Sequence, residues 1–131
     1  MLLFKTSSDT FESVIRNQCH ASFGIPNEWH PGELVIVSKN KKDCGENEKQ
    51  VQYTMRLVDI RPITGEEIDL YWPGSTGRWR YLVVCNDTRK IEHPFDLKDI
   101  LGKEAARYNP VMTFCKIDAG HEELLMARLP V

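Results

Sequence analysis

The chain has 131 residues, 41% of them hydrophobic and 27% charged, which is an ordinary composition for one globular domain. Its 17 basic and 19 acidic residues give a net charge of −2, whereas proteins that bind duplex DNA mainly through its phosphates are usually basic. No apolar run approaches the roughly 20 residues of a membrane span, and the N-terminal MLLFKTSSD lacks the features of a signal peptide. We therefore expect one domain over residues 1–131, in the cytoplasm and without membrane contact.

The N-terminal half alternates short apolar runs with turns. Phe11, Val14 and Ile15 share one helical face, which predicts a short amphipathic helix. Alternating apolar and polar residues over 51–60 predict a half-buried strand. In chain order, we expect a strand at 2–4, a helix at 10–17, an extended stretch at 19–23, and strands at 34–37 and 51–60.

The C-terminal half follows the same logic. Asp96 or Lys98 is expected to begin a helix, because apolar residues then recur at helical spacing. The remaining expectations are a turn at 64–67, a short strand at 68–72, a strong strand at 79–85, a short edge segment around 91–95, a strand at 111–117 and a helix after Asp118. Strands joined by turns, with no helical crossovers, predict an α+β fold: a curved, mostly antiparallel sheet or small β-barrel with peripheral helices.

The usual signatures of catalysis and phosphate binding are missing from the sequence. It has no Gly-x-x-x-x-Gly-Lys-Ser/Thr, no Gly-x-Gly-x-x-Gly, no Gly-x-Ser-x-Gly and no His-Glu-x-x-His. Its four histidines lack metal-site spacing, and its four cysteines form no Cys-x-x-Cys pair. We expect three cysteines in the core and Cys44 in a loop, no cofactor and no metal, which favours a binding module over an enzyme.

Aromatic and basic residues suggest a ligand site. Trp72 lies just before a Gly-rich turn, whereas Trp79 begins a strand and is expected in the core. Flat aromatic faces at loop positions are how proteins stack an unpaired base. Basic side chains near these loops could contact phosphates. They are Lys39, Lys41, Arg78 and Arg80.

Three stretches resemble a known family. The segment from Phe4 to Asp9 with the helix to Asn17, the run His20–Pro26, and the Pro31-Gly32-Glu33 turn are similar to the opening of the PUA-like superfamily, in its EVE and YTH branch. Pro94 before Leu97-Lys98 continues the likeness. The resemblance covers the first 40 residues and, more loosely, 68–101.

This resemblance implies a PUA-like barrel that recognises a modified base, in RNA or DNA, within an aromatic cage. The Lys5-Thr6-Ser7 turn would line the floor of the pocket, and Trp72 would form one wall. His20 stands where YTH domains carry tryptophan, and Ser22 follows it closely. We expect His20 or Phe23 to sandwich the base with Trp72, while Thr6, Ser7 and Ser22 hydrogen-bond its edge.

Two alternatives remain open at this stage. The related ASCH branch includes amidohydrolases acting on modified nucleosides, and Lys5 and Thr6 with a carboxylate such as Glu33 or Asp69 could be catalytic. The ASCH-type Gly-x-Lys-x-x-Glu signature is absent, however. The other alternative is a protein-interaction module.

Overall fold

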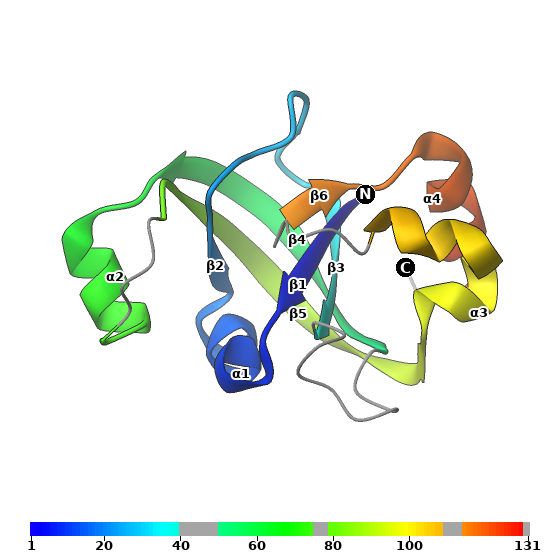
Figure 1. The fold of residues 1–131 in the computed structure, drawn as a ribbon, viewed down its shortest axis with the longest axis horizontal. Coiled ribbons are helices and arrows are strands. Elements are labelled where there is room, and N and C mark those ends of the chain that lie inside the picture. The colour runs from blue at the N-terminus through cyan, green and yellow to red at the C-terminus, as the bar shows by residue number, and fades with distance from the viewer. Residues whose placement is uncertain (40–49, 75–78, 109–113, 130–131) are drawn as a thin grey trace.

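The structure is a computed structural model, and it describes residues 1–39, 50–74, 79–108 and 114–129. A curled six-stranded sheet forms a half-barrel with helices packed around it (Figure 1). The strands are β1 (Leu2–Thr6), β2 (Cys19–Ser22), β3 (Leu34–Lys39), β4 (Val51–Pro62), β5 (Tyr81–Phe95) and β6 (Phe114–Lys116). The helices are α1 (Ser8–Asn17), α2 (Gly65–Tyr71), α3 (Leu97–Leu101), the 3-10 helix η2 (Gly102–Tyr108) and α4 (Ala119–Met126).

The sheet is antiparallel except at one pair of strands. Its order is β2-β5-β4-β3-β1-β6, and only β1 and β3 run parallel. The long pair β4 and β5 carries three register shifts between Val51 and Asp59, and such bulges increase the twist and bend of a strand pair. The expectation of an α+β fold with a curved, mostly antiparallel sheet is therefore confirmed.

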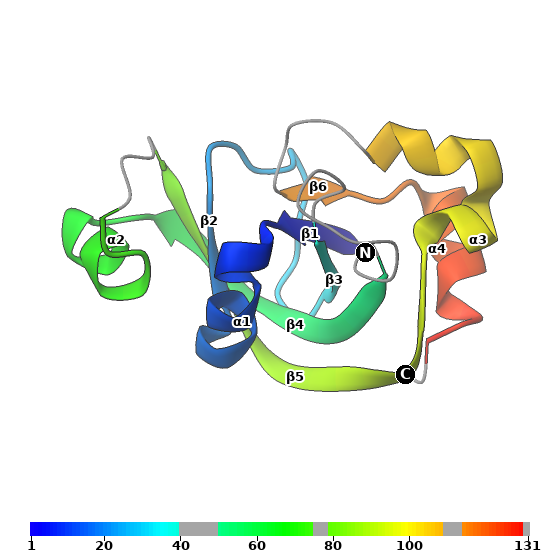
Figure 2. The same ribbon diagram turned by 60° about the horizontal axis from the view of Figure 1, so that its bottom comes forward.

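Two hydrophobic cores lie on opposite faces of β1. Leu3 belongs to the core that packs against α3, η2 and α4, whereas Leu2 and Phe4 belong to the core beneath α1. Figure 2 shows α1 on one side of the sheet and α3 with α4 at the other end. Because side chains alternate along a strand, β1 is the boundary between the two cores.

The expected strand at 68–72 is wrong, because these residues continue a helix. Thr64 and Glu67 form a capping box: the Thr64 hydroxyl accepts from the Glu67 N–H, and the Glu67 carboxylate accepts from the Thr64 N–H. This box converts the expected turn at 64–67 into the start of α2. Helix α2 has no buried residue. It therefore does not need the apolar residues at helical spacing by which a packed helix is recognised in a sequence.

Removing the Thr64 hydroxyl is expected to loosen α2. Losing an N-cap typically costs about 1 kcal/mol, so Thr64→Ala should raise amide exchange across α2 about fivefold. Hydrogen exchange measured by NMR or mass spectrometry tests this. Thr64→Ser, which keeps a capping oxygen, is the matched control, and equal exchange in both variants would contradict the assigned cap.

A partly buried group of polar residues joins the C-terminal helices. Asp96 begins α3 with its own capping box, as expected. The Tyr108 hydroxyl accepts from the Asp118 N–H at 3.0 Å and contacts Nδ1 of His121 at 2.6 Å. Nε2 of His121 in turn contacts the Glu104 carboxylate. These bonds join η2 to α4 across the core that contains Tyr108 and Leu125.

Two other expected boundaries change. The edge segment expected around 91–95 is the end of β5, which begins at Tyr81 rather than at Trp79. Of the strand expected at 111–117, the structure describes β6 alone. No helix in the described ranges is long and apolar enough to cross a membrane.

Candidate functional site

Two predicted stacking residues, His20 and Trp72, lie side by side. His20 is on edge strand β2, paired with Val83, and Trp72 is the C-cap of α2. Their ring centroids are 6.3 Å apart with 36° between the ring planes. This separation is within the range of direct aromatic contact, so a base could enter between the two rings only if Trp72 moved outward.

The His20 imidazole is buried without ordinary hydrogen bonds. The residue is 5% exposed, and neither ring nitrogen has a hydrogen-bond partner among the described residues. The Phe4 ring packs edge to face against the imidazole, with 5.4 Å between the ring centroids. Burial lowers the pKa of His20 to about 4, an effect that the backbone of Lys5 partly offsets. The ring is therefore neutral at pH 7, with one N–H donor and one nitrogen acceptor.

The predicted hydroxyl groups of Thr6, Ser7 and Ser22 make local hydrogen bonds. Thr6 is 1% exposed, and its hydroxyl shares a hydrogen bond with Thr10 on α1. The Ser7 hydroxyl also contacts Thr10, at 3.0 Å. The Ser22 hydroxyl donates to the Gly24 carbonyl. They shape the turn into α1 and the end of β2, and their oxygens keep lone pairs that could accept a further bond.

Lys5 does not join Thr6 in one pocket. Phe4 is buried in the core beneath α1, where Thr6 bonds to Thr10, whereas Lys5 lines a cavity beside α3 and η2. Lys39 lies at the same cavity and also over the Phe11 ring, 4.9 Å from its centroid. The predicted phosphate contacts thus divide between separate places.

Arg80 is exposed and lies just before β5. Its backbone N–H donates to the Ser22 carbonyl, which places Arg80 beside the end of β2. Lys41 and Arg78 lie outside the described residues.

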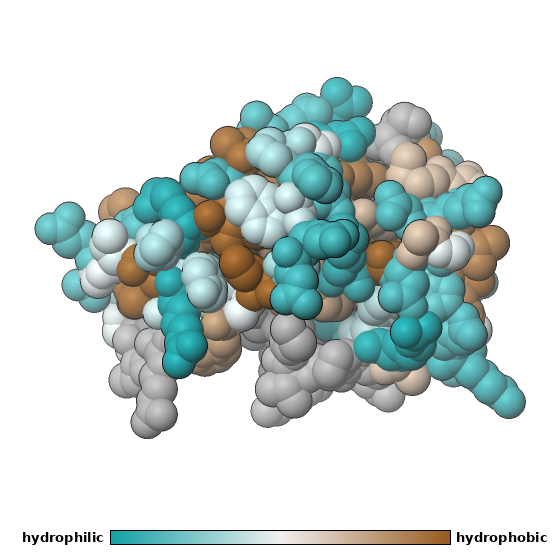
Figure 3. Space-filling model, turned by 90° about the horizontal axis from the view of Figure 1, so that it is seen from above, coloured by the Kyte–Doolittle hydropathy of each residue, from teal (hydrophilic) through white to brown (hydrophobic). Residues whose placement is uncertain are grey.

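A second aromatic pair lies at the end of β2. Phe23 is 53% exposed and stacks on Trp79, with 4.6 Å between ring centroids and 29° between planes. Phe23 therefore pairs with Trp79 and not with His20. Sequence reasoning placed Trp79 in the core, because nothing local to the chain reveals that Trp79 and Phe23 meet. Seen from above, hydrophobic residues are exposed in the central and left-hand parts of the molecule, between hydrophilic ones (Figure 3).

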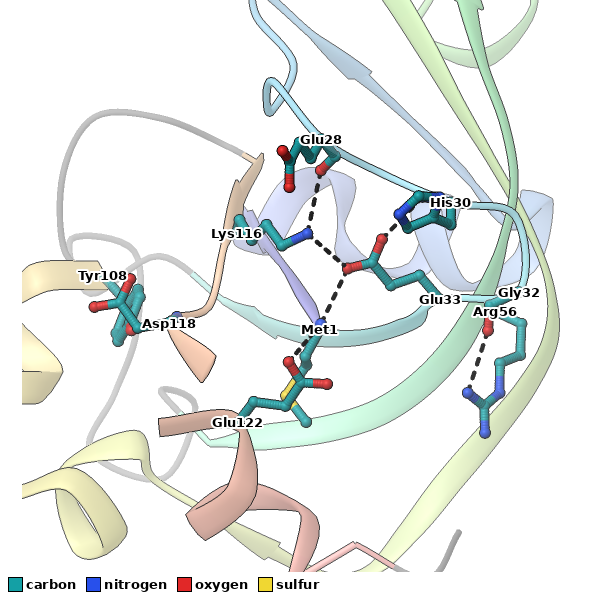
Figure 4. Close-up of polar contacts among 10 residues, drawn as sticks. All are labelled: Met1, Glu28, His30, Gly32, Glu33, Arg56, Tyr108, Lys116, Asp118 and Glu122. Atoms are coloured by element: carbon teal, nitrogen blue, oxygen red, sulfur yellow. Dashed lines mark hydrogen bonds and ion pairs between the residues drawn. The ribbon is translucent and has the colours of Figure 1, made fainter. Parts of the chain in front are cut away.

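The two carboxylates considered for catalysis lie away from Lys5. Glu33 bonds to the α-amino group of Met1 at 3.1 Å, to the His30 N–H at 3.1 Å and to Lys116 at 3.4 Å (Figure 4). Burial by itself would raise the pKa of Glu33, but these partners hold it below its usual value. Asp69 is exposed on α2. Neither lines the cavity of Lys5.

The described cysteines are poor nucleophiles. Burial raises the pKa of Cys19 to about 11 and that of Cys85 to about 12, and it also raises the pKa of the half-buried Cys115. Since the thiolate is the reactive form, these three thiols stay protonated at neutral pH. Cys44 lies outside the described residues.

Comparison with known proteins supports the fold. No family model matches the sequence, and no curated protein matches it significantly. Among solved structures, the ASCH protein from Zymomonas mobilis superimposes with a TM-score of 0.61 at 11% identity, over 98% of this chain and 94% of that one. Two point variants of that protein, a tyrosine-to-phenylalanine and a serine-to-alanine change, give TM-scores of 0.62 at 10% and 12% identity. They cover 98% and 96% of this chain, and 97% and 94% of theirs. ASCH domains belong to the PUA-like superfamily, so the chain has a PUA-like fold.

Proposed function

We propose that this chain, built on the PUA-like fold of ASCH domains, binds nucleic acid or a modified nucleotide by holding one unpaired base at His20 and Trp72. One observation carries the proposal: a buried, neutral imidazole, whose ring nitrogens make no hydrogen bond of normal geometry within the described residues, lies directly beside a half-buried tryptophan. Buried polar groups are nearly always hydrogen-bonded, and an unpaired one calls for an explanation. A ligand that pairs with His20 supplies that explanation.

A nucleobase fits the chemistry of this pair. The neutral imidazole offers one donor and one acceptor, and the edge of a base presents both kinds of partner. Trp72 offers a flat face, and stacking a base on an aromatic ring contributes about 1–3 kcal/mol. Phe4, at the edge of the imidazole, holds the ring in place from the core side.

Room for the base comes from displacing Trp72. Helix α2 buries none of its residues, so moving it outward disrupts little of the core. The base then enters between the two rings, or stacks on Trp72 with its edge toward His20. Selectivity for a modified base would come from the shape of this space, bounded on the core side by Phe4.

Residues at the end of β2 would contact the nucleotides next to the bound base. The exposed Phe23 stacked on Trp79 offers a second aromatic face, and the exposed Arg80 supplies a cation beside it. Stacking faces combined with cations are typical of sites that bind single-stranded nucleic acid. These contacts favour a single strand over a duplex, in agreement with the net charge of −2.

Replacing Trp72 is the direct test. Trp72→Ala is expected to weaken binding of single-stranded oligonucleotides about tenfold, because one stacking interaction is lost, while the melting temperature stays unchanged. Fluorescence anisotropy at low salt, with RNA and DNA oligonucleotides carrying plain or methylated bases, measures the affinity.

Trp29→Ala is the matched control, since Trp29 is a half-buried tryptophan packed against the core beneath α1. It should leave the affinity unchanged. Two results would overturn the proposal: no binding of any oligonucleotide by the wild type, or equal binding by the Trp72→Ala variant. Unfolding of that variant would show that Trp72 serves the core.

One observation favours a second function, amide hydrolysis on a modified nucleoside. Burial lowers the pKa of the Lys5 amine, an effect that the Cys115 thiol partly offsets, and such an amine can act as a base. Incubation with modified nucleosides followed by mass spectrometry distinguishes the two functions. Turnover would replace the binding proposal with the hydrolytic one.

A further inference from the structure

A small cavity lies on the sheet where β3, β4 and β5 meet. Its volume is about 110 Å³, below the roughly 300 Å³ at which sites for organic molecules begin. It has room for a few water molecules or for an ion of similar size. The described residues that line it are Leu34, Thr54, Met55, Arg56, Asp87 and Arg89.

A bulge in β5 brings the charged side chains together. Thr54 on β4 pairs with Arg89 on β5. The next pair joins Arg56, two residues further along β4, to Asn86, three residues back along β5. The extra residue on β5 accompanies a positive φ of 52° at Asp87, a conformation that aspartate and asparagine adopt more readily than most residues. Bulges often re-aim side chains beside functional sites, and this one places Asp87 next to Arg89.

Each guanidinium is held by one contact that leaves most of its donors free. Nη1 of Arg56 donates to the Gly32 carbonyl at 3.3 Å, and its other terminal nitrogen points away from Gly32 (Figure 4). Nε of Arg89 donates to the Asp87 carboxylate at 3.2 Å. Neither guanidinium makes a further hydrogen bond or ion pair with the described residues. Since an arginine has five N–H donors, both can bind a ligand while they stay held.

The lining has a surplus of one positive charge. Two arginines give +2 and Asp87, the one carboxylate among the described lining residues, gives −1, so the sum is +1. Thr54 adds an uncharged donor: it is 3% exposed, and its hydroxyl makes no hydrogen bond with the described residues. The apolar Leu34, 6% exposed, closes one side. This chemistry fits a small anion that accepts several hydrogen bonds.

We propose that this cavity binds a phosphate group, either in the backbone of a nucleic-acid strand or as free inorganic phosphate. The planar fork of arginine matches the oxygens of phosphate and can bind two of them at once. Gly32 and Asp87 already hold the two guanidinium groups, so less side-chain freedom is lost on binding. The hydroxyl of Thr54 donates to a further oxygen.

The cavity is separate from the proposed base site. Met55 belongs to the core beneath α1 together with Phe4, which contacts His20. Arg56 follows Met55 on β4, and because side chains alternate along a strand, Arg56 lies on the opposite face, beside its partner Leu34. Phosphate binding here therefore does not depend on His20.

Titration of the full chain at constant ionic strength tests this inference. Inorganic phosphate and dimethyl phosphate, a phosphodiester, are expected to shift the NMR signals of Thr54, Arg56 and Arg89 in a saturable way. The double variant Arg56→Gln/Arg89→Gln should weaken phosphate binding about tenfold or more, because charge-assisted hydrogen bonds are lost. Neither arginine is buried, so the fold should persist.

Two further variants make the test specific. Lys90→Gln is the matched control: it removes one positive charge from the exposed residue next to Arg89, which does not line the cavity. It should leave phosphate affinity unchanged. Asp87→Asn raises the charge of the lining from +1 to +2, and asparagine tolerates the positive φ and can still accept from Arg89. It should tighten phosphate binding about threefold.

The inference is overturned if phosphate produces no saturable shifts, if the shifts lie elsewhere, or if the double variant and Lys90→Gln bind phosphate equally well. Fluorescence anisotropy with a single-stranded oligonucleotide then identifies the source of the phosphate. Weaker binding of the strand by the double variant would assign the site to a nucleic-acid backbone, and unchanged binding would assign it to free phosphate. Trp72→Ala should leave phosphate affinity unchanged, so failure here and failure of the base-binding proposal are distinguishable.

Discussion

Acidification from pH 7 to pH 4 is expected to lower the free energy of unfolding by about 3 kcal/mol more in the wild type than in a His20→Leu variant. The buried imidazole has a pKa of about 4, below the ordinary value of 6.5. Between these values the unfolded state binds a proton that the folded state does not. Above pH 6.5, His20 is neutral in both states and does not reduce the free energy of unfolding through protonation. As the pH falls from 6.5 toward 4, protonation of His20 in the unfolded state lowers this free energy by about 1.4 kcal/mol per pH unit.

Urea denaturation at several pH values measures this difference. The comparison between variants cancels the titration of the carboxylates, which both proteins share. His20→Leu should also be more stable at pH 7 by about 1 kcal/mol, because it removes an unsatisfied buried polar group. His20→Gln keeps a polar side chain without a titrating group, so it should lose the pH dependence only. Parallel pH curves for wild type and both variants would contradict the assignment.

Phe4→Ala is expected to lower the free energy of unfolding by about 3–5 kcal/mol, the usual effect of removing a fully buried phenylalanine. Phe4 is completely buried and packs against Phe114 at 4.9 Å and His20 at 5.4 Å. Urea denaturation should show a lower midpoint at an unchanged slope. Phe4→Leu should lose much less, since most of the volume remains.

The same residue connects stability to the proposed site. Phe4 holds the His20 ring from the core side, so Phe4→Leu, which stays folded, should also weaken oligonucleotide binding. Phe95→Leu is the matched control, because Phe95 is 1% exposed in the other core, with Leu3 and α3. It should reduce stability to a similar degree and leave binding unchanged. Equal loss of binding in both variants would show that Phe4 acts through stability alone.

Local patterns predicted the fold class and most elements. Alternating polarity over 51–60 gave β4, and the acidic residue before Leu97 gave the start of α3. The error at 68–72 has a local cause as well. Ile68, Leu70 and Trp72 alternate as in a strand, but the Thr64–Glu67 capping box commits the chain to a helix. The capping box was the sequence signal for a helix. It outweighs the alternation of apolar residues, because no residue of α2 is buried.

The candidate site could be predicted only in part. His20 and Trp72 were named from the sequence, and the structure places them 6.3 Å apart. That Phe23 turns to Trp79 instead was not predictable, because it depends on how β2 pairs with β5. The cavity lined by Arg56 and Arg89 was also missed, since it depends on the bulge that sets β5 against β4.

Neighbouring residues alone set the alternation along β1 and the caps that begin α2 and α3, because a strand's pleat and a helix's first hydrogen bonds depend only on residues close in the chain. Which residues pack against each face of β1 depends on the folded chain as a whole. Phe4 contacts His20, whereas Lys5 lines a cavity beside α3 and η2. These surroundings come from segments far away in the sequence, which are brought together only when the sheet curls and the two cores form.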